Sequence, residues 1–212
     1  MKKTELVFIL DRSGSMSGLE SDTIGGYNSM LKNQKAEKGV AFVTTVLFDD
    51  EYTLVHDGVS IDQIKPLSKK EYYVRGTTAL LDAVGKTVNN LIHRIKNTKK
   101  VDQADKVMFV IITDGMENSS KDYSYQKVKS LIDYQKENYG WEFVFLGANI
   151  DAIKTAASFG IDQDRAVSYH SDSIGTKLNY QVVSDLVSNV RQAREIDKSW
   201  KKDIEEDYKK RS

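Results

Sequence analysis

Three short runs of uninterrupted apolar residues, spaced along the chain with helical patterns between them, constrain the fold most. They lie at residues 6–10, 106–113 and 142–146 and consist mainly of Val, Ile, Leu and Phe. Runs of this length without alternating polar residues are typical of strands buried on both faces of a sheet. Strands that alternate with helices are joined by parallel crossovers, so a layered α/β fold is expected.

The remaining segments complete this arrangement. Residues 40–48 are β-branched and aromatic, and a second strand pattern follows at 51–56, which predicts an antiparallel hairpin. Residues 165–169 predict a short sixth strand, and the charged segment 96–106 a loop. Apolar positions at helical spacing predict helices over 21–37, 78–96, 122–138 and 151–159. A last helix is predicted from residue 173, with an apolar stripe that continues through Trp200 to Ile204.

The predicted fold is therefore a doubly wound α/β sheet of six mostly parallel strands, with one antiparallel edge strand and helices on both faces. The 212 residues suit one domain of this kind. We place it at residues 1–196, followed by a charged carboxy-terminal helix extension or tail at 197–212. An alternative use of that last helix is self-association or docking around Trp200, as in a scaffold protein.

Composition narrows the class of protein. The 31 Lys and Arg residues balance the 31 Asp and Glu residues, so nothing indicates a nucleic-acid partner. The chain has no Cys, which excludes disulfides and thiolate sites and fits a reducing compartment. The apolar run at 6–10 is too short for a signal peptide, and no stretch reaches the length of a membrane span. A cytoplasmic protein without a membrane partner is expected.

Oxygen-bearing side chains follow two of the buried strands and precede one helix. Ligands of open α/β sheets bind beyond the carboxyl ends of the strands. Carboxylates and hydroxyls are the donors that Mg²⁺ or Mn²⁺ prefers. Taken singly, these residues also suit ordinary turns, and a threonine before a helix suits an N-cap. Taken together, they predict a divalent-metal site formed by Asp11, Ser13, Ser15, Thr78 and Asp114.

These segments resemble a known family. Residues 8–16, Phe-Ile-Leu-Asp-Arg-Ser-Gly-Ser-Met, resemble the Asp-x-Ser-x-Ser motif of von Willebrand factor A (VWA) domains, part of their metal-ion-dependent adhesion site (MIDAS). Residues 76–83 are similar to the family's threonine motif and residues 111–115 to its aspartate motif. The resemblance extends to about Arg194. Arg75 stands where the family often has a second glycine, so the local loop is expected to differ.

The resemblance implies a role for each matching residue. Ser13 and Ser15 would coordinate the metal directly, and Thr78 directly or through water. Asp11 and Asp114 would act mainly through bound waters or as hydrogen-bond acceptors. A metal held mostly by neutral hydroxyls keeps positive charge, so an acidic side chain of a partner protein could complete its coordination. The expected function is metal-dependent protein binding, with Glu117 and Asn118 as candidates for selecting the partner.

The main alternative is a metal-dependent hydrolase of phosphoryl substrates, since such enzymes also carry a carboxylate after a first buried strand. Hydrolases of the haloacid dehalogenase type need a second aspartate two residues later, where this chain has Ser13. The segment Gly14–Gly18 has Met16 at the centre, where a nucleophile elbow needs serine, and no phosphate-binding P-loop is present. We therefore expect no enzyme.

Overall fold

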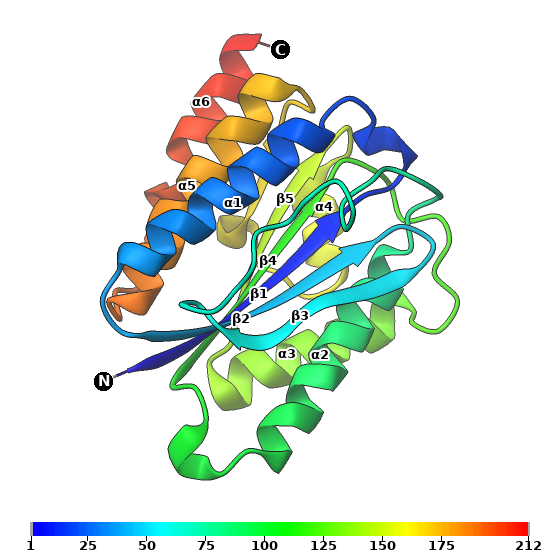
Figure 1. Cartoon of the computed structure of the whole chain (residues 1–212). Coiled ribbons are helices and arrows are strands. Elements are labelled where there is room, and N and C mark those ends of the chain that lie inside the picture. Colours follow the sequence, from blue (N-terminus) through cyan, green and yellow to red (C-terminus); the bar gives the residue numbers. More distant parts are fainter. Residues whose placement is uncertain (1, 212) are drawn as a thin grey trace.

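A six-stranded sheet in the order β3-β2-β1-β4-β5-β6 forms the middle layer of the computed structural model, which describes residues 2–211 (Figure 1). Neighbouring strands are parallel except β2 and β3, which form an antiparallel hairpin at one edge. This confirms the predicted fold class, including the antiparallel edge strand. The strands are β1 (Lys3–Asp11), β2 (Val40–Phe48), β3 (Tyr52–Ser60), β4 (Lys106–Thr113), β5 (Glu142–Ala148) and β6 (Ala166–Tyr169).

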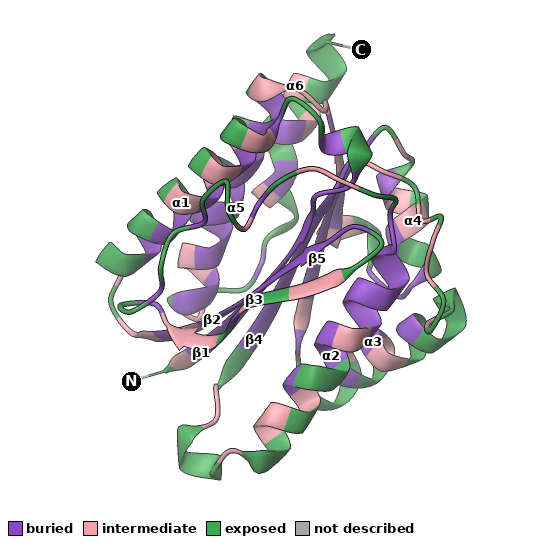
Figure 2. Ribbon diagram, turned by 45° about the vertical axis from the view of Figure 1, so that its right-hand side comes forward, coloured by how far each residue is buried: buried purple, intermediate pink, exposed green. Residues whose placement is uncertain are grey.

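Helices cover both faces of the sheet. One face carries α1 (Glu20–Ala36), α5 (Ser173–Arg191) and α6 (Lys202–Arg211), and the other carries α2 (Leu80–Asn97), α3 (Tyr125–Tyr139) and α4 (Ala152–Ser158) (Figure 1). Because side chains alternate across a strand, β1 contributes Phe8 to the first core and Ile9 to the second. The central strands β1, β4 and β5 are buried beyond their first residues (Figure 2), which explains why their sequences lack polar alternation.

The chain connections run toward one edge of the sheet on the β1 side and toward the other edge on the β4 side, so β1 and β4 flank a topological switch point. The chain leaves β1 through α1 on one face to reach β2, and it leaves β3 through α2 on the opposite face to reach β4. At such a switch point the two connections diverge and leave a crevice beyond the carboxyl ends of the strands. Asp11 ends β1 and Asp114 directly follows β4, so the fold brings these two carboxylates to the same crevice.

The carboxy-terminal region differs from the prediction. The single helix predicted from residue 173 through Ile204 is interrupted, because α5 ends at Arg191 and Ala193 adopts a positive φ of 60°. A short 3-10 helix at Lys198–Lys201 then leads into α6. Trp200 packs against the core of the α1 and α5 face and its indole N–H donates to the carbonyl of Asp164, at 2.8 Å.

The α6 helix contributes to this core through Ile204, which is 1% exposed. Elsewhere the predicted loop at 96–106 contains one 3-10 turn, at Lys100–Asp102. None of the helices within residues 2–211 is long and apolar enough to cross a membrane.

Replacement of Ile204 by alanine tests the packing of α6. We expect Ile204→Ala to lower the free energy of unfolding by about 2–4 kcal/mol, because it removes a buried side chain and leaves a cavity. The matched control is Ile174→Ala, which makes the same change at a side chain that is 61% exposed and should cost less than about 0.5 kcal/mol. Chemical denaturation measures both. Equal effects of the two substitutions would contradict the packing of α6 on the core.

Candidate metal centre

The hydroxyl groups of Ser13, Ser15 and Thr78 gather at the carboxyl edge of the sheet. Ser13 Oγ lies 3.1 Å from Ser15 Oγ. A Cβ atom placed on Gly115 would lie 2.8 Å from Thr78 Oγ1, 3.1 Å from Ser15 Oγ and 3.6 Å from Ser13 Oγ. The three hydroxyls therefore surround one small space that Gly115 leaves open. Residues predicted from two separate sequence motifs are brought together here.

Asp114 lies beside these hydroxyls. It is 1% exposed, and its Oδ1 accepts a hydrogen bond of 2.5 Å from Ser15 Oγ. Its Oδ2 accepts one of 2.8 Å from the hydroxyl of Ser171. Ser171 was not among the predicted site residues. The available signal was its position just after the end of β6, which is also a strand end at this edge.

Asp11 is equally buried, at 1% exposure, and its carboxylate is turned toward the backbone of its own loop. Its Oδ1 accepts the N–H of Ser13 at 2.6 Å, and its Oδ2 accepts the Thr113 hydroxyl at 2.5 Å. Burial raises the pKa of Asp11 from 3.8 to about 6, and these hydrogen bonds oppose that rise. Asp11 thus orients the serine loop while its charge remains poorly solvated.

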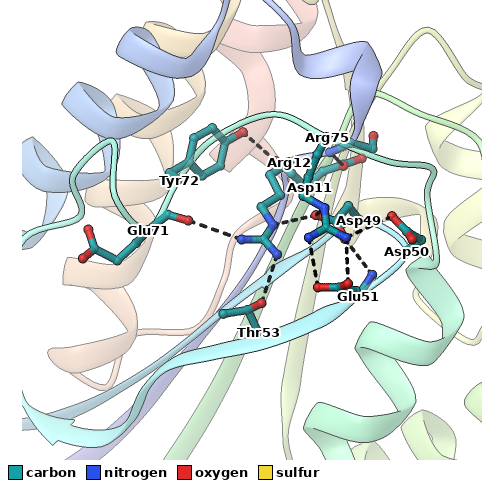
Figure 3. Close-up of polar contacts among 10 residues, drawn as sticks. Asp11, Arg12, Asp49, Asp50, Glu51, Thr53, Glu71, Tyr72 and Arg75 are labelled. Carbon is teal, nitrogen blue, oxygen red and sulfur yellow. Dashed lines mark hydrogen bonds and ion pairs between the residues drawn. The ribbon is translucent and has the colours of Figure 1, made fainter.

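No positively charged side chain neutralises this pair of carboxylates. Within residues 2–211, neither Asp11 nor Asp114 forms a salt bridge. The arginines of the two neighbouring loops instead share Asp49, which is fully buried (Figure 3). Arg12 Nε lies 2.8 Å and Arg75 Nε 3.4 Å from Asp49 Oδ2. Two buried acidic groups therefore lie beside three hydroxyls, and residues 2–211 supply neither of them with a cationic partner.

Hydrogen bonds join the serine loop to the threonine loop. The N–H of Arg75 donates to the carbonyl of Arg12 at 3.0 Å, and the N–H of Gly14 donates to the carbonyl of Gly76 at 3.1 Å. Arg75, where the sequence resemblance predicted a local difference in the loop, also pairs with Glu51 at 2.8 Å (Figure 3). The loop therefore gains side-chain contacts that a glycine could not make.

Thr78 is positioned from the loop that follows β4. Its N–H donates to Asn118 Oδ1 at 2.9 Å, and the N–H of Asn118 donates back to the carbonyl of Thr78 at 3.0 Å. Thr78 does not cap α2, because the residue before that helix is Ala79 and no side chain of the N-cap accepts a hydrogen bond. Glu117 instead accepts the N–H of Leu81 at 2.8 Å, at the start of α2.

The donor set has a defined chemistry. In the part of the chain that the structure describes, no three Asp, Glu, His or Cys side chains gather as they would at an imidazole-rich or carboxylate-rich centre. The available donors are two carboxylates and a group of hydroxyls. Hard divalent cations that keep several waters, such as Mg²⁺ and Mn²⁺, suit donors of this type. The arrangement fits the metal that the sequence resemblance implies.

Comparison with known proteins gives a likeness of fold. No protein-family model and no curated protein matches the sequence. A solved von Willebrand factor type A structure from Catenulispora acidiphila is 15% identical, with a TM-score of 0.61 over 89% of this chain and 43% of that one. The ArnB paralog VWA2 from Sulfolobus acidocaldarius is 18% identical, with a TM-score of 0.54 over 88% of this chain and 45% of that one.

A third similar structure is proximal thread matrix protein 1 from the mussel byssus, whose MIDAS motif is occupied by zinc. It is 18% identical, with a TM-score of 0.58 over 88% of this chain and 46% of that one. The chain spans less than half the length of each of these three structures. Its sheet order, its helical layers and these likenesses agree: the chain has the fold of a von Willebrand factor type A domain.

Proposed function

We propose that this chain is a protein-binding module that depends on a divalent metal, Mg²⁺ or Mn²⁺. The observation that carries the proposal is the pair of buried carboxylates, Asp11 and Asp114, which lie beside three hydroxyls and form no salt bridge with any described residue. Burial of unpaired charge costs several kcal/mol, and a bound divalent cation offsets that cost. The zinc-occupied MIDAS of the mussel protein supports a metal at the equivalent edge of this fold.

The residues of the site would contact the cation in two ways, directly and through water. Ser13 and Ser15 would bind it directly, and Thr78 directly or through water. Asp11 and Asp114 would hold its waters and accept hydrogen bonds from the ligands, as Asp114 already does from Ser15. When bound, the metal supplies a positive charge that a carboxylate can coordinate.

A partner carboxylate is the group we propose for the open side of the metal. The groups that would bind the cation directly are neutral hydroxyls, and Asp11 and Asp114 would act only through its waters, so the metal would keep a coordination position suited to an anionic ligand. Ser15 is exposed, whereas Ser13 and Thr78 are buried, which leaves the approach to the site on the Ser15 side. The partner is therefore a protein that presents an acidic side chain.

Thermal melts test the metal. We expect saturating Mg²⁺ or Mn²⁺ to raise Tm by roughly 5–10 °C, since a ligand at about 100 times its Kd stabilises the folded state by about 2.7 kcal/mol. EDTA should reverse the increase, and Ser13→Ala with Ser15→Ala should abolish it. Ser158→Ala, at an exposed serine of α4, is the control and should respond like the wild type.

Two outcomes would reject the proposal. Equal Tm values with EDTA and with metal would contradict the proposed metal site. Turnover of a phosphoester substrate that is lost in Asp11→Ala would assign the site to a hydrolase instead.

The cost of the buried Asp11 carboxylate is measurable without metal. An unfolded chain releases this proton near pH 3.8 and the folded protein near pH 6, so stability in EDTA should fall as pH rises through this window. Asp11→Asn carries no charge, and at pH 8 we expect it to be more stable than the wild type by on the order of 2–3 kcal/mol. It should also lose the stabilisation by Mg²⁺.

Denaturation in EDTA at pH 4 and pH 8 provides the measurement. Asp62→Asn, at an exposed carboxylate, serves as the control and should follow the wild type at both values. A lower stability of Asp11→Asn at pH 8 would show that the hydrogen bonds of Asp11 outweigh its desolvation.

Asn118 is expected to position Thr78 for the metal. Asn118→Leu removes the acceptor of the Thr78 N–H and should weaken Mg²⁺ binding about tenfold, a typical effect for groups that orient metal ligands. Asn118→Asp keeps an oxygen at this place and should retain the affinity within a few-fold. Titration calorimetry gives the Kd of each variant. Unchanged affinity of Asn118→Leu, together with a lower Tm, would limit Asn118 to stabilising the loop.

A further inference from the structure

The loop after β4 exposes a large apolar side chain next to the proposed metal site. Met116 is 69% exposed and directly follows Gly115, whose backbone faces the three hydroxyls. A single exposed apolar residue is common on protein surfaces. What distinguishes Met116 is that the backbone around it is fixed by hydrogen bonds.

The loop is held on both sides of Met116. Before it, the N–H of Gly115 donates to Thr113 Oγ1 at 3.3 Å. After it, Asn118 exchanges two hydrogen bonds with Thr78. Further along, Asp82 of α2 accepts the N–H groups of residues 121, 122 and 123 at 3.0, 2.9 and 2.8 Å. Met116 is therefore exposed in a loop whose backbone is held in place by hydrogen bonds.

The carboxylate next to Met116 does not oppose an acidic ligand. Glu117 is the nearest carboxylate in the loop, and both of its oxygens are occupied. Oε1 accepts the N–H groups of Ser119 and Ser120 at 3.0 and 2.8 Å, and Oε2 accepts the Leu81 N–H and the Ser120 hydroxyl, each at 2.8 Å. This carboxylate is turned inward to four donors, so it presents little negative charge to a partner carboxylate at the metal.

A second exposed apolar side chain lies at the same edge of the sheet. Ile174 is 61% exposed in the first turn of α5, three residues after Ser171. The Ser171 hydroxyl is bonded to Asp114, which places the start of α5 beside the carboxylate that Met116 follows in the chain. Met116 and Ile174 thus belong to two separate segments that meet at Asp114.

We propose that Met116, with Ile174, is an apolar docking position for a partner segment that has an apolar side chain close to its metal-binding carboxylate. This rests on the proposed function and specifies its partner. Gly115 borders the three hydroxyls, and the Cα of Met116 is about 3.8 Å from that of Gly115. Because an extended partner chain advances by about 3.3 Å per residue, its apolar residue lies within about two positions of the acidic one. The flexible thioether of methionine adapts to apolar side chains of different shape.

Selection from a displayed library of random heptapeptides tests this specificity. The full chain is immobilised with Mg²⁺, and bound peptides are eluted with EDTA. We expect peptides with Asp or Glu and a large apolar residue within two positions. Met116→Ser should still select acidic peptides but without the apolar preference, and it should bind the best wild-type peptide about tenfold more weakly.

The matched control is Val101→Ser, which alters another side chain of high exposure, 77%, in the turn before β4 at the opposite end of the sheet. It should select and bind like the wild type. An Mg²⁺-induced rise in Tm equal to that of the wild type shows that the metal site of Met116→Ser is intact. Acidic peptides without an apolar preference, or equal binding by Met116→Ser, would overturn the docking position and leave the proposed function standing. No Mg²⁺-dependent peptide at all would overturn both.

Discussion

The parallel pairing of β1 with β4 is the constraint on which the candidate site depends. Leu10 pairs with Ile112, so the two strands end side by side, and their crossovers lie on opposite faces. Both strands are buried on both faces, so ligands can reach this switch point only beyond their carboxyl ends. This pairing places Asp11 and Asp114 side by side, because each lies where its strand leaves the core. The same packing that stabilises the sheet therefore forces two acidic groups into a poorly solvated place.

Asp49 explains why the chain does not neutralise these groups itself. Arg12 is only 2% exposed and lies between Asp11 and Ser13 in sequence, yet its guanidinium is directed to Asp49 (Figure 3). Arg75 is drawn to the same carboxylate from the threonine loop. Buried ion pairs add specificity of arrangement more than stability. Here the ion pairs separate the charges: the arginines join the two loops through Asp49, and the carboxylates of the crevice would be available to the proposed cation.

The local sequence pattern was sufficient to predict those elements whose structure is determined by a single stretch of chain. The uninterrupted run at 6–10 predicted a central strand, and the paired runs at 40–48 and 51–56 predicted the edge hairpin. Contacts between distant segments cannot be predicted from such a local pattern: Ser171 reaches Asp114 across 57 residues, and Asn118 reaches Thr78 across 40. For Ser171 the sequence offered only its position after a predicted strand. The end of α5 was also hidden, because alanine is the strongest helix former and Ala193 nevertheless takes a positive φ.

The loop after β4 links the two halves of the proposed function through its hydrogen bonds. Asn118 fixes Thr78, a proposed metal ligand, while Glu117 is anchored to the start of α2 at Leu81. Met116, the proposed contact with the partner, lies between these anchors and Gly115. A binding surface already held in one conformation loses little conformational entropy when a partner docks. The contacts that shape the metal site would therefore also lower the cost of recognising the partner, which makes the site and its specificity one structural unit.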